Sequence, residues 1–111
     1  MTPEQQRIAI AEWMGWQYSW TLLSGTKLYS RDQQELAEYH LPDYVNDLNA
    51  IHEAEKRIPE DQTMIYGLHI NEIMLKDFES GNKKEHAICD WYATASQRAE
   101  ALLRTIGKWI D

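Results

Sequence analysis

Apolar residues recur every three or four positions between Leu41 and Ile58, which is the spacing of one face of an α-helix. The recurring positions are Leu48, Ile51, Ala54 and Ile58, with Tyr44 or Val45 one turn earlier. Pro42 and Asp43 predict the start of this helix, because proline disfavours helix in the residue before it and aspartate can cap the first turn. Pro59 ends it. We therefore predict one amphipathic helix that lies on a core.

Two capping boxes predict further helices. In a capping box a Ser or Thr side chain and a Glu or Gln three residues later satisfy each other's backbone N–H groups. Thr2 and Gln5 form the first such pair, and Gly15 is a natural end for that helix. Thr94 and Gln97 form the second, and Gly107 ends that helix. We expect this helix to run through Ala99, Leu102, Leu103 and Ile106, with Trp109 packing back onto the domain.

From Trp16 the apolar period changes to two, which is the period of a β-strand. The alternation places four large side chains on one face: Trp16, Tyr18, Trp20 and Leu22. Ser24 and Gly25 predict a turn, and residues 27–30 can return as a short partner strand.

The remaining segments give weaker patterns. Residues 31–40 are polar and weakly helical, which indicates a surface connection. Residues 60–78 suggest a helix, while a strand within 64–70 is the alternative. The expected inward positions of that helix are Ile65, Leu68 and Leu75, and residues 86–92 best fit a strand. Together these elements predict one α+β domain, similar to an α/β/α sandwich, with a mainly antiparallel sheet of about three strands and about four helices.

The net charge of −7 is concentrated in one part of the chain. The window from Asp32 to Asp61 holds nine acids and two bases, whereas the rest of the chain holds nine of each. Phosphate contacts require a basic footprint, so direct binding to nucleic acid is disfavoured. An acidic surface would instead attract a partner with a basic surface. The alternative is a solvated acidic face that only aids solubility.

Composition predicts a soluble protein of the cytoplasm. Cys89 is the single cysteine, which excludes an internal disulfide and favours a buried structural thiol in a reducing compartment. No apolar run approaches the roughly 20 residues that span a bilayer. The first residues also lack the basic start and apolar middle of a signal peptide.

No catalytic motif stands out, and we predict neither enzyme activity nor a cofactor. His52 and Glu55 lie three residues apart and share a helix face, which would permit shared metal ligation. No second pair with ligand spacing accompanies them, and HExxH is absent, so an ordinary surface histidine is the favoured interpretation and no metal site is predicted.

Aromatic residues form the other distinctive set. The rings of Trp16, Tyr18 and Trp20 would be core if they face the helices. If part of this set is open, it forms a pocket for a planar ligand together with Trp91 and Tyr92. Basic groups for a phosphate would then come from Arg7, Lys83, Lys84 or Arg98.

Three blocks together resemble the phage ABA sandwich domain family of small bacteriophage and prophage proteins. They are MTPEQQRIAIAEWMGW at residues 1–16, LPDYVNDLNAIHEAEK at 41–56 and ATASQRAEALLRTIGKW at 93–109. The resemblance implies an α/β layered domain, expression in the cytoplasm of an infected or lysogenic bacterium, and no catalytic residues to carry over.

Three functional hypotheses follow. The first is a non-enzymatic phage accessory protein that binds a basic host protein, such as a nuclease or defence factor, and inhibits it. Its acidic face with apolar anchors would consist of Glu35, Glu38, Tyr39, Asp43, Tyr44, Asp47 and Glu53. The second is a protein that sequesters a small ligand or nucleotide in the aromatic pocket. The third is a homo-oligomeric structural or regulatory phage component.

Overall fold

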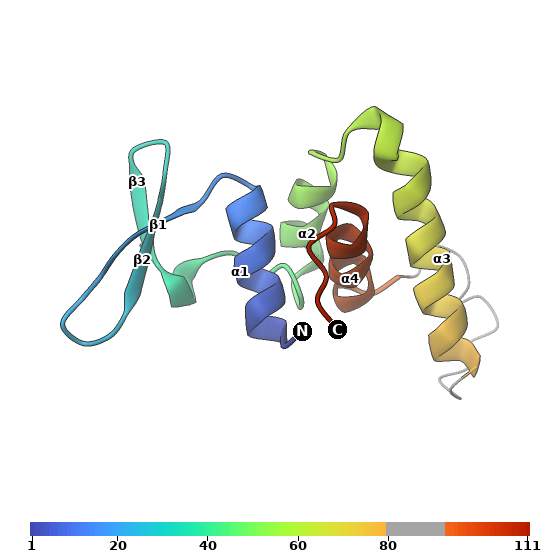
Figure 1. Ribbon diagram of the computed structural model, residues 1–111, viewed down its shortest axis with the longest axis horizontal. Coiled ribbons are helices and arrows are strands. Elements are labelled where there is room, and N and C mark those ends of the chain that lie inside the picture. Colours follow the sequence, from blue (N-terminus) through green and yellow to red (C-terminus); the bar gives the residue numbers. More distant parts are fainter. Residues whose placement is uncertain (80–92) are drawn as a thin grey trace.

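The computed structural model describes residues 1–79 and 93–111, with side chains described through residue 77 in the first range. Within these ranges the chain forms a three-stranded antiparallel sheet and four α-helices, which confirms the predicted α+β class. Figure 1 shows the sheet at one end of an elongated molecule, next to helix α1 (Pro3–Trp13), with the other helices beyond it. The two termini lie close together, and the Met1 ammonium donates to the Ile110 carbonyl at 3.0 Å.

Both predicted capping boxes are present. The Gln5 N–H donates to the Thr2 hydroxyl at 3.1 Å, and the Thr2 N–H donates to the Gln5 side chain at 2.9 Å. Thr94 and Gln97 repeat the arrangement with the same two distances at the start of α4 (Ala95–Thr105). These bonds satisfy N–H groups that a helix start leaves without partners, so the local sequence alone fixes where both helices begin.

Helix α2 (Leu48–Glu55) is much shorter than the helix predicted for residues 41–58. Asp47 is its N-cap and accepts from the Asn49 N–H at 2.9 Å, whereas Asp43 caps the preceding turn by accepting from the Asn46 N–H at 3.2 Å. The prediction of the start was wrong because short polar side chains favour turns and caps over helix interiors. The inward positions Ile51 and Ala54 are confirmed as fully buried, while Leu48 is exposed.

The predicted hairpin is confirmed as β1 (Gln17–Thr21) and β2 (Lys27–Arg31). The prediction of a surface connection at residues 31–40 was wrong. This segment forms the third strand, β3 (Gln34–Ala37), and a 3₁₀ turn, η1 (Glu38–His40). Asp32 and Gln33 make the connecting turn with φ of 51° and 67°, the backbone of the tight two-residue turns that suit twisted strands. Asn-Gly and Asp-Gly are the usual pairs for this turn, so Asp-Gln did not indicate a hairpin.

The predicted common face for the strand aromatics was also wrong. Tyr18 pairs with Tyr29 across the sheet and Trp20 pairs with Leu28, so Ser19 is an extra residue in β1 and forms a bulge. Paired residues share a face, and neighbouring residues of β2 point to opposite faces. Tyr18 and Trp20 therefore lie on opposite faces of the sheet.

Residues 63–79 form helix α3 (Thr63–Glu79), preceded by the 3₁₀ turn η2 (Glu60–Gln62). The helix interpretation is confirmed, and the strand alternative was wrong. The predicted inward positions were wrong as well, since Ile65, Leu68 and Leu75 are all exposed. The face that packs inward carries Tyr66, Ile70, Ile73 and Met74. The strand predicted at 86–92, with Cys89, lies outside the described residues.

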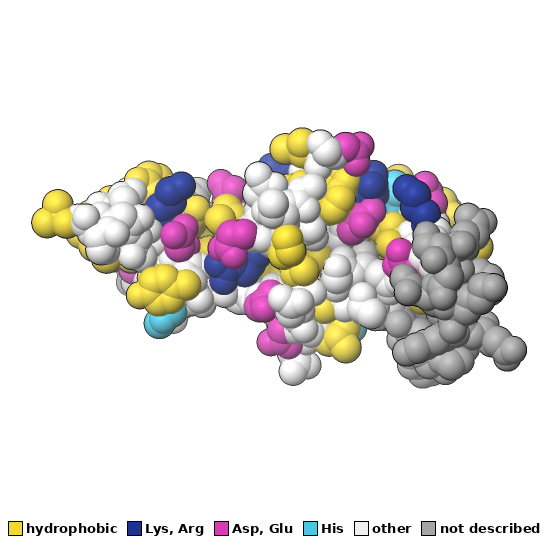
Figure 2. All heavy atoms as spheres, turned by 90° about the horizontal axis from the view of Figure 1, so that it is seen from below, with side chains coloured by type: hydrophobic (Ala, Val, Ile, Leu, Met, Phe, Trp, Pro, Cys, Tyr) yellow, Lys and Arg dark blue, Asp and Glu magenta, His cyan; other side chains and the backbone are white. Residues whose placement is uncertain are grey.

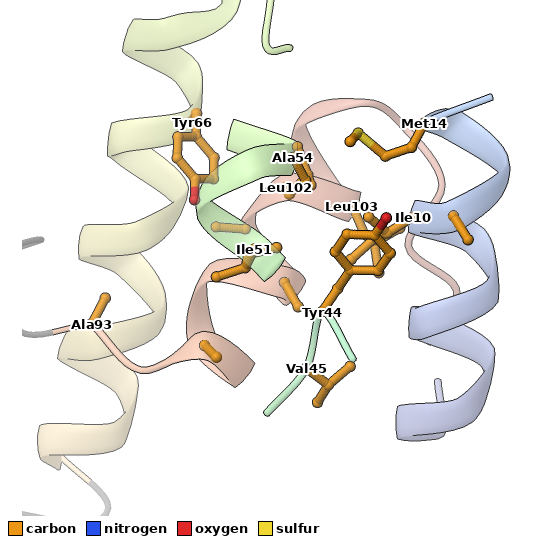
Figure 3. Packing of buried hydrophobic residues seen from close by; sticks show 14 of the residues in the cluster. Ile10, Met14, Tyr44, Val45, Ile51, Ala54, Tyr66, Ala93, Leu102 and Leu103 are labelled. Carbon is orange, nitrogen blue, oxygen red and sulfur yellow. The ribbon is translucent and has the colours of Figure 1, made fainter. Parts of the chain in front are cut away.

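The core lies among the helices (Figure 3). Helix α4 contacts α1, α2 and α3, and its Leu102 and Leu103 are fully buried. Tyr44 and Val45 reach the same core from the turn before α2. Trp109 packs partly buried against it, which confirms the prediction for that residue. In the described part of the chain, no helix combines the length and the apolar character needed to cross a membrane.

Candidate functional site

The residues of the predicted acidic face have different surroundings. Asp43 and Asp47 act as caps, and the Glu53 carboxylate pairs with the Lys56 ammonium at 2.9 Å. Tyr44 is only 2% exposed and lies in the core, so its predicted role as a surface anchor was wrong. Tyr39, in contrast, is exposed.

The other two acids lie near the sheet. Glu35 is exposed on β3, and Glu38 is half-buried at the start of η1. Figure 2 shows acidic side chains separated by white and yellow atoms, with dark-blue basic side chains among them. On this side of the molecule the acids do not form one continuous patch.

The described aromatic rings of the predicted ligand pocket do not come together. Trp16 is 3% exposed and belongs to the core, whereas about half of Tyr18 and of Trp20 is exposed on opposite sheet faces. Tyr18 rests edge-on against Tyr29, with ring centroids 6.1 Å apart. Trp91 and Tyr92 lie outside the described residues.

Two of the four bases proposed for that pocket have partners elsewhere. Arg7 pairs with Glu4 and donates to the Leu41 carbonyl, and Arg98 pairs with Glu55 at 2.9 Å. Lys83 and Lys84 lie outside the described residues. The guanidinium at Trp16 belongs instead to Arg31, 4.7 Å from the ring centroid. The register of the predicted hairpin was the signal for this contact, because Gln17 pairs with Ser30 and the next residues are then neighbours.

Glu55 is the centre of a partly buried polar cluster that joins three helices. One carboxylate oxygen contacts His52 Nδ1 at 2.6 Å, which confirms that these residues share a helix face. The other oxygen accepts from the Tyr66 hydroxyl of α3 and from Arg98 of α4. Burial favours the neutral acid, but the hydrogen bonds from Tyr66, His52 and Arg98 outweigh it and lower the pKa of Glu55. Burial, with Glu55 beside it, raises the pKa of the Tyr66 hydroxyl.

The Glu55 cluster is built as a structural link between helices. Tyr66 and Arg98 complete the coordination of the carboxylate, so the positive partner of Glu55 is a guanidinium. A metal ion shared by His52 and Glu55 would need a third ligand. The described residues contain no group of three His, Cys, Asp or Glu side chains placed to hold a metal.

A hollow of about 420 Å³ opens where the end of α1 meets the second turn of the sheet. It is lined by Met14, Gly15, Gln17, Ser30, Arg31, Asp32, Gln33 and Arg57. A second hollow of about 340 Å³ lies at the meeting of the termini, next to Met1, Ala9 and Ile110. The first hollow has the more polar lining residues, and two of them are arginines.

Comparisons of the chain with protein-family models, with curated proteins and with solved structures find no match. The resemblance to a phage family therefore stays a prediction.

Proposed function

We propose that this protein is a non-enzymatic binding protein whose sheet end docks onto a partner protein with a basic surface. The observation that supports this is the group of large apolar side chains exposed on and beside the sheet. Trp20 is 51% exposed, Tyr18 54%, Tyr39 64%, and Leu23 projects fully at the first hairpin turn. Aromatic side chains of this kind are enriched at the energetic centres of protein interfaces.

The outer face of the sheet combines such a side chain with an acid. Trp20, Leu28 and Ala37 pair across the three strands and share this face. Gln17, Ser30 and Glu35 pair in the same way two positions further along and share it too. Glu35 is exposed there, so a basic side chain of a partner can approach it while the partner covers Trp20.

The position of the sheet also favours docking. Figure 1 shows the strands standing clear of the helices beyond α1, and Figure 2 shows yellow apolar side chains at the sheet end of the molecule, including its tip. Exposed apolar patches rimmed by polar residues commonly mark interaction sites. The acids that follow the sheet, Glu38 and Asp43, would extend the contact with a basic surface.

The resemblance to phage proteins would place the partner inside an infected bacterium. A basic host surface of this kind is typical of proteins that bind nucleic acid, including nucleases and defence factors. Covering that surface would inhibit the host protein without any chemical step.

A photo-crosslinking residue in place of Trp20 tests the proposal in the cell that produces the protein. We expect an adduct with a basic protein, weakened by about 0.5 M salt because exposed charges are screened at that ionic strength. The control places the same residue at Met64, which is 77% exposed on α3. The charge reversal Glu35→Lys should reduce the adduct further.

Three results would contradict the proposal. They are equal labelling from both positions, an adduct unaffected by salt and by charge reversal, or no adduct at position 20. An adduct with a second copy of this chain would support the homo-oligomer instead.

A further inference from the structure

The Arg31 side chain lies against three consecutive residues that follow the end of α1. The Arg31 Nη1 donates to the Met14 carbonyl at 3.3 Å, and its guanidinium lies 4.7 Å from the centroid of the Trp16 ring. Gly15 lies between them with φ of 102°, and a Cβ there would be 3.4 Å from the Arg31 Cδ. The left-handed backbone is what favours glycine here, and it brings residue 15 into contact with the Arg31 side chain. The guanidinium is held in one orientation before any ligand arrives.

A second arginine, Arg57, lines the same hollow and follows the end of α2 by two residues. Burial raises the pKa of the Tyr44 hydroxyl, and Arg31 and Arg57 both oppose that rise, which indicates that both cations lie near this hydroxyl. Among the described side chains, those of residues 1–77 and 93–111, Arg57 forms no ion pair. Its charge is available to a ligand.

The local balance of charge is positive, although the chain as a whole carries −7. Asp32 is the single acid among the lining residues, and it is 92% exposed and 3.9 Å from the Arg31 Nε. Gln17, Ser30 and Gln33 add neutral groups that can donate hydrogen bonds. Arginine forks match the oxygen geometry of phosphate and carboxylate, and two of them favour a doubly charged anion.

We propose that this hollow binds the phosphate group of a small molecule, between Arg31 and Arg57. Its volume of about 420 Å³ falls within the roughly 300–1,000 Å³ of small-molecule sites. The same chemistry serves free inorganic phosphate and a phosphate monoester, so the experiment uses both. The inference is independent of the protein-binding proposal, since it requires no partner at Trp20.

Titration by NMR tests it at constant ionic strength, set with sodium chloride. The probes are inorganic phosphate and ribose 5-phosphate, and the reporters are the Trp16 indole N–H and the Gly15 backbone N–H. We expect saturable shifts with a Kd on the order of 1 mM, because the site is open and its charges are partly hydrated. Tighter binding of the ester would identify an organic phosphate as the ligand, and equal binding would identify phosphate itself; both support the proposal.

Matched variants separate a site from general charge. Arg57→Gln should weaken phosphate binding about fivefold, since it removes one charged donor. Lys56→Gln changes the net charge equally but lies outside the hollow, so it should leave the Kd within about twofold. Asp32→Asn should tighten binding about twofold, because a competing carboxylate is lost.

Two findings would overturn the proposal. One is the absence of saturable shifts at the two reporters up to about 20 mM phosphate, a concentration well above the expected Kd. The other is an equal effect of Arg57→Gln and Lys56→Gln. Because Arg57 is exposed and outside the core, its variant keeps the test valid even if substitutions of Arg31 disturb the fold.

Discussion

Replacing Glu55 by Gln should loosen the contact among α2, α3 and α4. The substitution keeps the size of the side chain and one acceptor oxygen but removes the negative charge. Arg98 and the Tyr66 hydroxyl then face a neutral amide in place of a carboxylate. The cost arises mainly at Arg98, because its largely buried guanidinium then faces a neutral amide.

The magnitude follows from the exposure of the pair. Removing one partner of a fully enclosed ion pair costs about 3–5 kcal/mol. Glu55 and Arg98 retain 15% and 13% side-chain exposure, so water relieves part of this cost. We expect Glu55→Gln to lower the free energy of unfolding by about 2 kcal/mol. At about 4 °C per kcal/mol for a domain of this size, the Tm should fall by about 8 °C.

The effect should depend on pH in a defined direction. The hydrogen bonds that outweigh burial hold the folded-state pKa of Glu55 below its ordinary value of 4.5. A lowered pKa means that the unfolded chain binds more protons, so stability rises with pH across this range. The contribution of Glu55 is complete above pH 4.5 and is lost as the pH falls through the folded-state pKa. The difference between the wild-type protein and the variant should therefore shrink in acid.

Chemical denaturation followed by tryptophan fluorescence, repeated across pH 3 to 7 in steps of about one unit, measures both effects. Glu53→Gln is the matched control on the same helix, since Glu53 pairs with Lys56 and both side chains are largely exposed. It should change the free energy of unfolding by less than about 0.5 kcal/mol. The reasoning fails if the two variants are equally stable at neutral pH, or if the deficit of Glu55→Gln persists unchanged in acid.

Substitutions at four further positions test the backbone and the caps by denaturation. Gln33→Gly should raise the free energy of unfolding by about 1 kcal/mol, because it removes the strain of a φ of 67°; a loss would contradict the turn. Gly107→Ala should lower the free energy of unfolding by about 1 kcal/mol, because the backbone at this position has a φ of 78°. Gly67→Ala, inside α3 with open space around it, should raise the free energy of unfolding by about 0.5 kcal/mol. Shifts of the same sign in the two variants would contradict this reasoning. Thr94→Ala should lower the free energy of unfolding by about 1 kcal/mol, because it removes the hydroxyl that caps α4. Thr94→Ser keeps this hydroxyl and should not lower the free energy of unfolding, as measured by the same transition.

The fold could be predicted from the sequence wherever a local rule was sufficient. The capping pairs at Thr2 and Thr94 each need only a few consecutive residues, and the structure contains both. Prediction failed where distant contacts decide the outcome. Helix α3 is apolar on several sides, so its period did not show that Tyr66 faces Glu55 while Leu68 faces outward. An apolar residue next to another apolar residue carries little information about which of them is buried.

The candidate site shows the same limit more sharply. No spacing rule connects Arg31 with Arg57, which lie on a strand and after a helix and meet only through the fold. The sequence offered four other bases for an anion, and of these Arg7 and Arg98 are occupied by Glu4 and Glu55. The contact between Arg31 and Trp16 could have been predicted only from the pairing register of the hairpin, in which Gln17 lies opposite Ser30.

The bulge at Ser19 links these failures to the proposed function. Strict alternation from Trp16 would have placed Tyr18 and Trp20 on the same face of the sheet, beside Tyr29. One extra residue turns Trp20 to the opposite face while Tyr18 stays beside Tyr29, so the strand presents a ring on each side. Bulges commonly re-aim side chains near functional sites. The one-residue irregularity in β1 therefore places Trp20 on the same face of the sheet as Glu35, where we propose that the partner docks.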